Sequence, residues 1–311
     1  MLESRDYFTT KIEDLKDLIT VSFVIIDDTY KEVTPTYIKN RRNVDKAINT
    51  DSEIITISIV GELLTINSEK SWLEFVKKNL KDLFPDICHR TRFNRTRRNL
   101  HDVIEQIREK LFKILGYHLD EYRIIDSMPI PVCNFGRAHF HKVFHRADYG
   151  YCASKKETYF GFKLHTLITL NGYITDFVIT PANIDDRAAI WDLISPYNSI
   201  KILGDKGYVD KDIKSDLKQE KNIDLFPLKR SNSKDPYPKS FRNLISKVRR
   251  RIETSFSQLT EQLNISKANA KSFWGLITRI KTKLLAHNLC YFINKHLGKT
   301  VNIGHIKELV F

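Results

Sequence analysis

The sequence predicts an α/β protein with a helical N-terminal domain, on three observations. From Tyr7 to Tyr117, apolar residues recur every three or four positions, which is the period of an amphipathic helix. After Gly116 the chain changes to short β-branched and aromatic runs separated by turn residues, a pattern typical of strands. From Ser240 onward the spacing of three and four returns, which predicts a long helix. We therefore predict a helical domain over residues 1–117 and a mixed α/β domain over residues 118–311.

The predicted elements of the second domain follow a definite order. Three strands come first, and Asn171-Gly172 between the second and third is the strongest short hairpin signal. The predicted strands and helices are Tyr122–Ile130, Thr158–Leu170, Tyr173–Thr180, a helix Asp185–Ile194, strand Ser199–Leu203, helix Asp210–Lys221, strand Ile223–Leu228 and the long helix. The order βββαβαβα matches the ribonuclease-H-like core, a mixed sheet covered by helices. A last helix, Ser272–Leu297, is expected to end at Gly298 and to pack on this core with the other C-terminal helices.

The charge of the chain points to a polyanionic partner. Its 51 Lys and Arg residues outnumber 38 Asp and Glu residues, giving a formal charge of +13, which favours nucleic acid. An anionic membrane surface would attract the same charge, but no apolar run approaches the roughly 18 residues of a spanning helix. The four cysteines are scattered without metal-site or disulfide spacing, and no secretory signal is visible, so we expect a cytoplasmic protein.

The most basic stretch lies at the end of the helical domain. It surrounds Phe93 with five arginines, namely Arg90, Arg92, Arg95, Arg97 and Arg98. Arginines on and before a helix suit contacts with DNA phosphates. The alternative is a charged helix face that is only solvated.

Three acidic residues are candidates for catalysis. Asp126 stands in an apolar strand, where an unpaired carboxylate is costly to bury; the alternative is an Asp that shapes the turn before Pro129. Asp205 follows a short apolar strand at the sheet edge where open α/β sheets bind ligands, and it could instead simply shape the loop. Glu253 lies on the long helix one turn after Arg249, with which it could form an ordinary ion pair.

The predicted fold order places the first strand, the fourth strand and the long helix side by side, so these three carboxylates can meet. Carboxylate oxygens are ligands that Mg²⁺ prefers. Two Mg²⁺ or Mn²⁺ ions about 4 Å apart can stabilise both oxygens of an in-line phosphoryl displacement.

Four segments carry a family resemblance. They are Ile124–Ser127, Tyr159–His165, Gly204–Tyr208 and Arg251–Leu259. In order and spacing they resemble the conserved blocks of bacterial insertion-sequence DDE transposases, in the subgroup with an Ile-Glu-Thr block. Related transposases often have a Tyr seven residues before the Glu and a Lys seven after it, where this chain has Ser246 and Thr260, whereas the Arg four residues before is present as Arg249.

The resemblance implies a transposase that recognises the terminal inverted repeats of a mobile element. It implies hydrolysis of a phosphodiester to free a 3′-hydroxyl, followed by attack of that hydroxyl on target DNA, with Asp126, Asp205 and Glu253 holding the metal ions. Double-stranded DNA is then the partner, with no small-molecule substrate, and a homodimer is expected because two element ends are processed together. The implied location is the bacterial cytoplasm, in association with the nucleoid.

Further basic residues near the acids are predicted to contact DNA. They are Arg137, Lys163, Lys206, Arg249 and Arg250. Arg137 belongs to a basic, aromatic loop over residues 131–156, whose Cys and His spacings match no standard zinc site. The alternative for this loop is a solvated surface segment. For Lys163, the alternative is a sheet face covered by the C-terminal helices.

Two alternative functions stay open at this point. A metal-dependent nuclease on the same fold would cut DNA without joining strands. A degenerate or domesticated transposase would bind the terminal repeats without turnover.

Overall fold

The computed structural model describes residues 12, 14–153, 155–229, 233, 235–267, 269–297 and 306–307. Contacts between Cα atoms divide the chain into two compact units. The helical unit comprises residues 1–115 and 258–311, and the sheet unit comprises residues 116–257. The predicted helical start at Tyr7 and the predicted stop at Gly298 lie outside the described residues.

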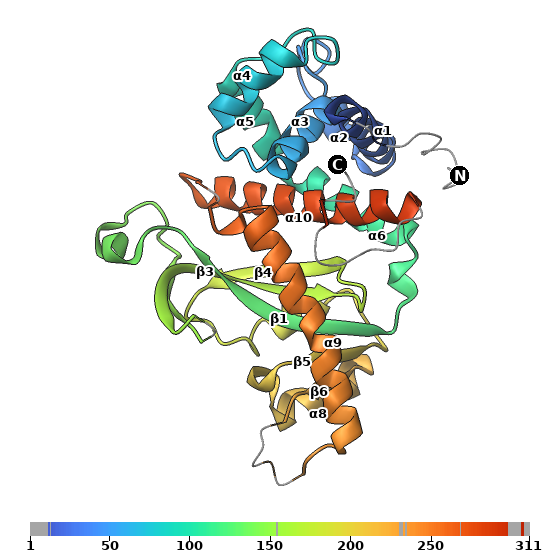
Figure 1. Ribbon diagram of the computed structural model, residues 1–311, viewed down its shortest axis with the longest axis vertical. Coiled ribbons are helices and arrows are strands. Elements are labelled where there is room, and N and C mark those ends of the chain that lie inside the picture. Colours follow the sequence, from blue (N-terminus) through green and yellow to red (C-terminus); the bar gives the residue numbers. More distant parts are fainter. Residues whose placement is uncertain are drawn as a thin grey trace. The chain divides into compact units, whose positions relative to one another are not determined.

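The helical unit is built from the N-terminal helices and the last helix of the chain. Its α-helices are α1 (Leu15–Val33), α2 (Thr36–Lys39), α3 (Asp51–Leu63), α4 (Glu69–Asn79), α5 (Arg90–Asn99), α6 (His101–Ile114) and α10 (Phe273–His296). Helix α10, red in Figure 1, packs against α3, α5 and α6. The contacts therefore group α10 with the N-terminal helices, whereas the sequence placed it with the α/β domain. The assignment of separate functions to the two domains stays a prediction.

Helix α3 forms the centre of the helical unit because nearly every one of its residues is buried. A capping box fixes its start, where the Thr50 side chain accepts from the Glu53 backbone N–H and the Glu53 side chain accepts from that of Thr50. The Trp72 indole of α4 lies against Gly61, where a Cβ would come within 2.7 Å of the ring, and donates to the Ile57 carbonyl (2.7 Å). A side chain at position 61 would therefore separate α3 from α4.

A buried ion pair links α3 to α10. The Lys283 ammonium, with no exposed side-chain area, contacts the Glu62 carboxylate and donates to the Leu263 carbonyl at 2.6 Å. Burial lowers the pKa of Lys283, because the charged form loses its hydration. Each charge therefore depends on the other for compensation in this core.

The sheet unit contains one mixed six-stranded sheet. Its strands are β1 (Tyr122–Pro131), β2 (Asp148–Cys152), β3 (Glu157–Ile168), β4 (Ile174–Pro181), β5 (Lys201–Gly204) and β6 (Asp224–Pro227). The path of paired strands is β2-β3-β1-β5-β6, and β4 also pairs with β3. Strand β3 is antiparallel to β1, β2 and β4, whereas β5 is parallel to both β1 and β6. The predicted α/β class and the mixed sheet are confirmed.

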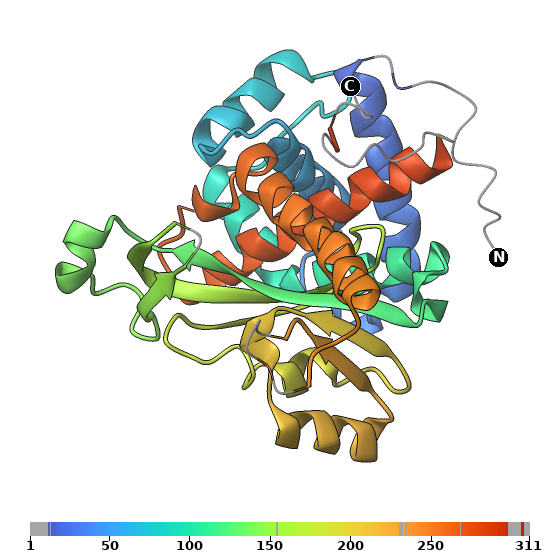
Figure 2. The ribbon, with the colours of Figure 1, turned by 60° about the horizontal axis from the view of Figure 1, so that its bottom comes forward.

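Helices cover both faces of this sheet. Ile125, Ile202 and Leu225 share a core with α7 (Ile190–Ile194) and α8 (Lys211–Lys221). Leu203, on the opposite face of β5, packs with Ile245 of α9 (Lys239–Ser257). Figure 2 shows α9 in orange on one side of the strands and α8 in gold on the other. Because side chains alternate along a strand, Asp126 points to the face that α9 covers.

The structure corrects the predicted elements at three places. The segment predicted as a loop over residues 131–156 contains a short 3₁₀ helix, Phe135–Phe140, and strand β2, so four strands precede the first α-helix of the sheet unit. Helix α7 begins at Ile190 rather than Asp185, because the Asp185 side chain accepts from the Arg187 backbone N–H and favours a turn there. The long helix is α-helical only to Ser257 and continues as a π-helix over Gln258–Gln262.

The predicted hairpin at Asn171-Gly172 is confirmed. Gly172 has φ +94°, and its N–H donates to the Thr169 carbonyl at 3.0 Å, which closes the turn between β3 and β4. Within the described part of the chain, no helix combines the length and apolar character needed to cross a membrane.

Candidate active site

Asp126 is the most buried of the three predicted acids. It lies in β1, and 19% of its side-chain surface is exposed. The Ser127 backbone N–H donates to its Oδ1 at 2.8 Å. Burial raises the pKa of Asp126 to about 6, and the Ser127 N–H and Arg249 offset only part of this rise. The folded chain therefore pays a desolvation penalty for keeping this carboxylate ionised at neutral pH.

The other two acids approach Asp126 from different elements. Asp205 follows the last residue of β5, a strand that runs parallel to β1. Glu253 lies on α9, the helix that packs on β1 and β5. The exposed fraction of the side chain rises from 19% at Asp126 to 42% at Asp205 and 58% at Glu253. The acids therefore form a site that is buried at Asp126 and open to solvent at Glu253.

The Arg249 guanidinium contacts all three acids. Its Nη2 lies 3.1 Å from Asp126 Oδ2 and 3.6 Å from Glu253 Oε1, and its Nη1 lies 3.4 Å from Asp205 Oδ1. The guanidinium is mostly buried, and its Nε has no hydrogen-bond partner among the described residues. Three carboxylates that are 79 and 48 positions apart in sequence thus converge on one cation.

The donor set suits a divalent cation. With the three carboxylates ionised, the negative charge of the acids exceeds the single positive charge of Arg249, and carboxylate oxygens are the ligands that Mg²⁺ prefers. Among the described residues, no group of three or more His, Cys, Asp or Glu side chains is already arranged to hold a metal ion. Arg249 is the group that the acids contact here, so binding of a cation between them would require this guanidinium to move.

The comparisons with known proteins decide the family. The model of the transposase DDE domain matches residues 117–289, more than half of the chain. The chain belongs to the DDE-domain transposase family. No curated protein and no solved structure gives a significant match. The matched region contains Asp126, Asp205 and Glu253, and membership of this transposase family implies an enzyme that acts on DNA.

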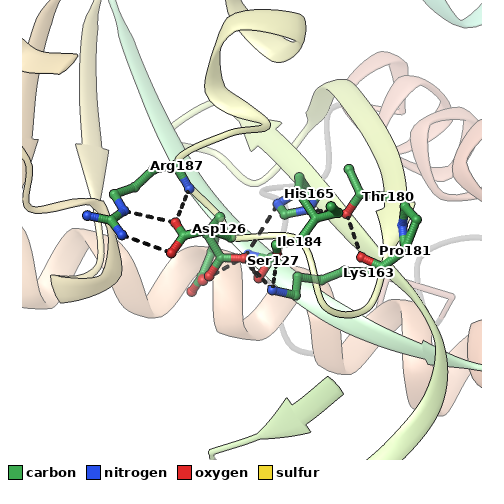
Figure 3. A network of polar contacts seen from close by, with 10 residues as sticks. Asp126, Ser127, Lys163, His165, Thr180, Pro181, Ile184 and Arg187 are labelled. Atoms are coloured by element: carbon green, nitrogen blue, oxygen red, sulfur yellow. Dashed lines mark hydrogen bonds and ion pairs between the residues drawn. The ribbon is translucent and has the colours of Figure 1, made fainter. Parts of the chain in front are cut away.

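The matched region contains a second cluster of polar side chains, which was not predicted from the sequence. Its centre is Asp186, whose Oδ1 accepts from Ser127 Oγ and Lys163 Nζ, both at 3.0 Å. Lys163 also donates to the Ile184 carbonyl at 2.8 Å, and only 18% of its side chain is exposed. Figure 3 shows Lys163 and Ser127 in this network. Lys163, predicted to contact DNA, therefore has its ammonium engaged within the protein.

His165 and Tyr208 extend this cluster. His165 Nε2 lies 2.9 Å from Thr180 Oγ1 (Figure 3), and burial lowers the pKa of His165 to about 4. The Tyr208 hydroxyl is buried without a hydrogen-bond partner among the described residues, and its pKa is raised by burial and by nearby carboxylates, first that of Asp186. Strand pairing brings Ser127 opposite His165. The only sequence signal for Asp186 was its place after the strand break at Pro181.

The remaining residues predicted to bind DNA lie in both units. In the sheet unit, Arg137, Lys206 and Arg250 are exposed to solvent, as a contact with DNA requires. In the helical unit, Arg90, Arg92 and Arg95 of α5 are exposed, whereas Arg97 is buried and pairs with Glu69 at 2.9 Å. Their contacts with DNA stay predictions.

The raised pKa of Asp126 leads to a prediction about stability. Asp126 titrates near 6 when folded, against an ordinary value of 3.8, so between about pH 4 and pH 6 the folded state binds more protons than the unfolded state. The free energy of unfolding therefore falls as pH rises through this window, and the loss persists above it. We expect Asp126→Asn to be more stable than the wild type at pH 8 by about 1–3 kcal/mol, with the difference vanishing below pH 4.

Urea unfolding from pH 4 to pH 8, with a chelator present to remove divalent cations, measures this difference. Asp216→Asn on the exposed face of α8 is the matched control, because it removes an exposed carboxylate from the same unit, and at pH 8 it should differ less from the wild type in stability than Asp126→Asn does. If Asp126→Asn and the wild type had equal free energies of unfolding at pH 8, burial of the Asp126 carboxylate would not destabilise the folded chain.

Proposed function

We propose that this chain is the transposase of a bacterial insertion sequence. It binds the terminal inverted repeats of the element and catalyses metal-dependent strand cleavage and strand transfer into target DNA. The observation that carries the proposal is the convergence of Asp126, Asp205 and Glu253 on one guanidinium, within the region that matches the transposase DDE domain. The charge of +13 supports a DNA partner.

We further propose that the sheet unit has the ribonuclease-H-like fold. Leaving aside β2, the strand order is β4-β3-β1-β5-β6, with an antiparallel half and a parallel half joined at β1. Asp126 lies in β1, Asp205 directly follows the adjacent parallel strand β5, and Glu253 lies on the covering helix α9. This arrangement supports the proposed fold because it brings the three acids to one edge of the sheet.

In the proposed mechanism, Asp126, Asp205 and Glu253 would hold Mg²⁺ or Mn²⁺, which would supply stabilisation of the charge that develops during an in-line phosphoryl displacement. Asp126 is ionised above its pKa of about 6 and then contributes its negative charge from the buried side of the site. Arg249, once displaced from the acids, presents a planar guanidinium that suits a two-point contact with a DNA phosphate. Glu253, the most exposed acid, lies where DNA would enter.

The proposed function is tested with labelled DNA carrying the ends that flank the gene. Incubation of the purified chain with this DNA should give a nicked or cut strand and a joined product in Mg²⁺ or Mn²⁺, and neither product in the presence of a chelator. Cleavage without joining would indicate a nuclease instead. Binding without either product would indicate a DNA-binding derivative, and metal-independent cleavage would rule out the proposed role of the three acids.

A further inference from the structure

A basic pocket of about 640 Å³ lies within the helical unit, between the start of α4, helix α5 and the start of α10. The cations that line it are Lys70, Arg90, Arg97, Arg98, Lys271 and Arg279. The acidic side chain among its described lining residues is Glu69. The pocket thus brings residues of the N-terminal helices together with residues about 200 positions later in the sequence.

Glu69 does not neutralise the pocket, because it is used within the protein. Its Oε2 accepts from Arg97 Nη2 and from Asn94 Nδ2, each at 2.9 Å. Arg97 is only 5% exposed, so this pair is part of the pocket wall. Lys70, Arg90 and Lys271 are exposed and leave their positive charge at the opening. The pocket therefore has a strong excess of positive charge at the surface that a ligand would meet.

Two helix starts add to this positive field. Ser68 caps α4 and Ser272 caps α10, where Ser272 Oγ accepts from the Gly275 N–H at 3.1 Å. Both serines line the pocket. Because the N-terminal end of a helix has a partial positive charge, both helices favour an anion here.

The lining also indicates which part of a polyanion fits. None of the described lining residues has an aromatic ring, so the pocket offers no aromatic surface on which a base could stack. Trp274, next to Gly275 in sequence, does not line the pocket; it is 44% exposed, and the Arg98 guanidinium lies over its ring, 5.2 Å from the centroid. The chemistry thus suits phosphates and sugars rather than bases.

We propose that this pocket binds the sugar–phosphate backbone of duplex DNA without reading its sequence. The inference rests on the proposed function. It deepens that function because it assigns Lys70, Lys271 and the start of α10 to the same DNA contact as Arg90 and Arg98. Arg97 is assigned a positioning role, because its guanidinium holds Glu69 rather than facing the ligand.

The test compares two double variants of the full chain that remove the same charge. Arg90→Ala/Lys271→Ala removes two exposed cations of the pocket, and Lys78→Ala/Lys113→Ala removes two exposed cations of the same unit that lie outside it. Fluorescence anisotropy with a labelled duplex of arbitrary sequence, over a series of salt concentrations, gives affinity and its salt dependence. We expect the pocket variant to lose about 10-fold or more in affinity and to flatten the log–log salt slope by about 1–2 units, with little change in the control.

Equal losses in the two variants, or no loss in either, would overturn the pocket as a backbone site. The cleavage assay on the same preparations separates this outcome from failure of the proposed function. A wild type that cleaves and joins DNA while the pocket variant binds normally would leave the function standing and remove the pocket. If the pocket variant loses the duplex binding that the wild type has, but the wild type never cleaves DNA, the pocket would stand as a backbone site and the proposed function would fail.

Discussion

Replacing Asp205 by Asn is expected to lower the rate of strand cleavage by about 1,000-fold or more while leaving DNA affinity nearly unchanged. Asn has the shape of Asp but lacks its charge, so it would no longer help the other two acids hold a divalent cation. Asp205 is 42% exposed at the end of β5, so the substitution should cost little folding stability. Single-turnover cleavage of labelled element-end DNA, with affinity measured in parallel, tests this expectation.

The matched control is Asp216→Asn, an exposed acid on α8 in the same unit, which should cleave at the wild-type rate. Asp126→Asn and Glu253→Gln are expected to behave like Asp205→Asn, because each removes one of the three charges that meet at Arg249. A fully active variant at any of the three positions would exclude that residue from the proposed triad. Loss of DNA binding together with cleavage would instead point to a role in holding DNA.

Replacing Lys283 by Ala is expected to destabilise the chain by about 3–5 kcal/mol. The substitution removes the cation that compensates Glu62 in a core where the Glu62 side chain is 7% exposed. It also removes the donor to the Leu263 carbonyl. The free energy of unfolding, measured by urea denaturation at pH 7, gives the size of the effect.

Two further variants separate the ion pair from general effects of substitution in α10. Lys281→Ala on the same helix breaks a pair with Asp102, whose side chain is 69% exposed and stays hydrated, so it should cost less than Lys283→Ala. The double variant Glu62→Leu/Lys283→Met removes both buried charges together and should recover most of the lost stability. If Lys283→Ala were no less stable than Lys281→Ala, the buried pair would not contribute to the fold as inferred.

Local sequence pattern was sufficient for most elements of the fold. The strand around Ile124 and Ile125, the turn at Asn171-Gly172 and the amphipathic pattern of α9 each depend on residues close together in sequence. Strand β2 was missed although Tyr149 and Tyr151 alternate with Asp148 and Gly150, because the segment is short and lies in a basic, histidine-containing stretch that was interpreted as a loop. It is a strand because its backbone pairs with β3, from Asp148 opposite Gly161 to Cys152 opposite Glu157. The pairing of β3 with β1 also depends on Gly161 in β3. A Cβ added at this position would lie 2.2 Å from the Ile130 carbonyl oxygen, so a larger residue would separate the two strands.

For the site, the sequence by itself determined which acids to consider, because a carboxylate in an apolar strand and another at a strand end are visible in the local pattern. Only the tertiary structure decided that Arg249 contacts all three acids, that Asp186 joins Ser127 to Lys163, and that Lys271 lies at the same pocket as Arg90. The physical reason is the range of the interactions. Helices and turns depend mainly on neighbours within a few residues, whereas strand pairing, burial, ion pairing and pKa shifts depend on groups that the fold brings together from distant parts of the chain.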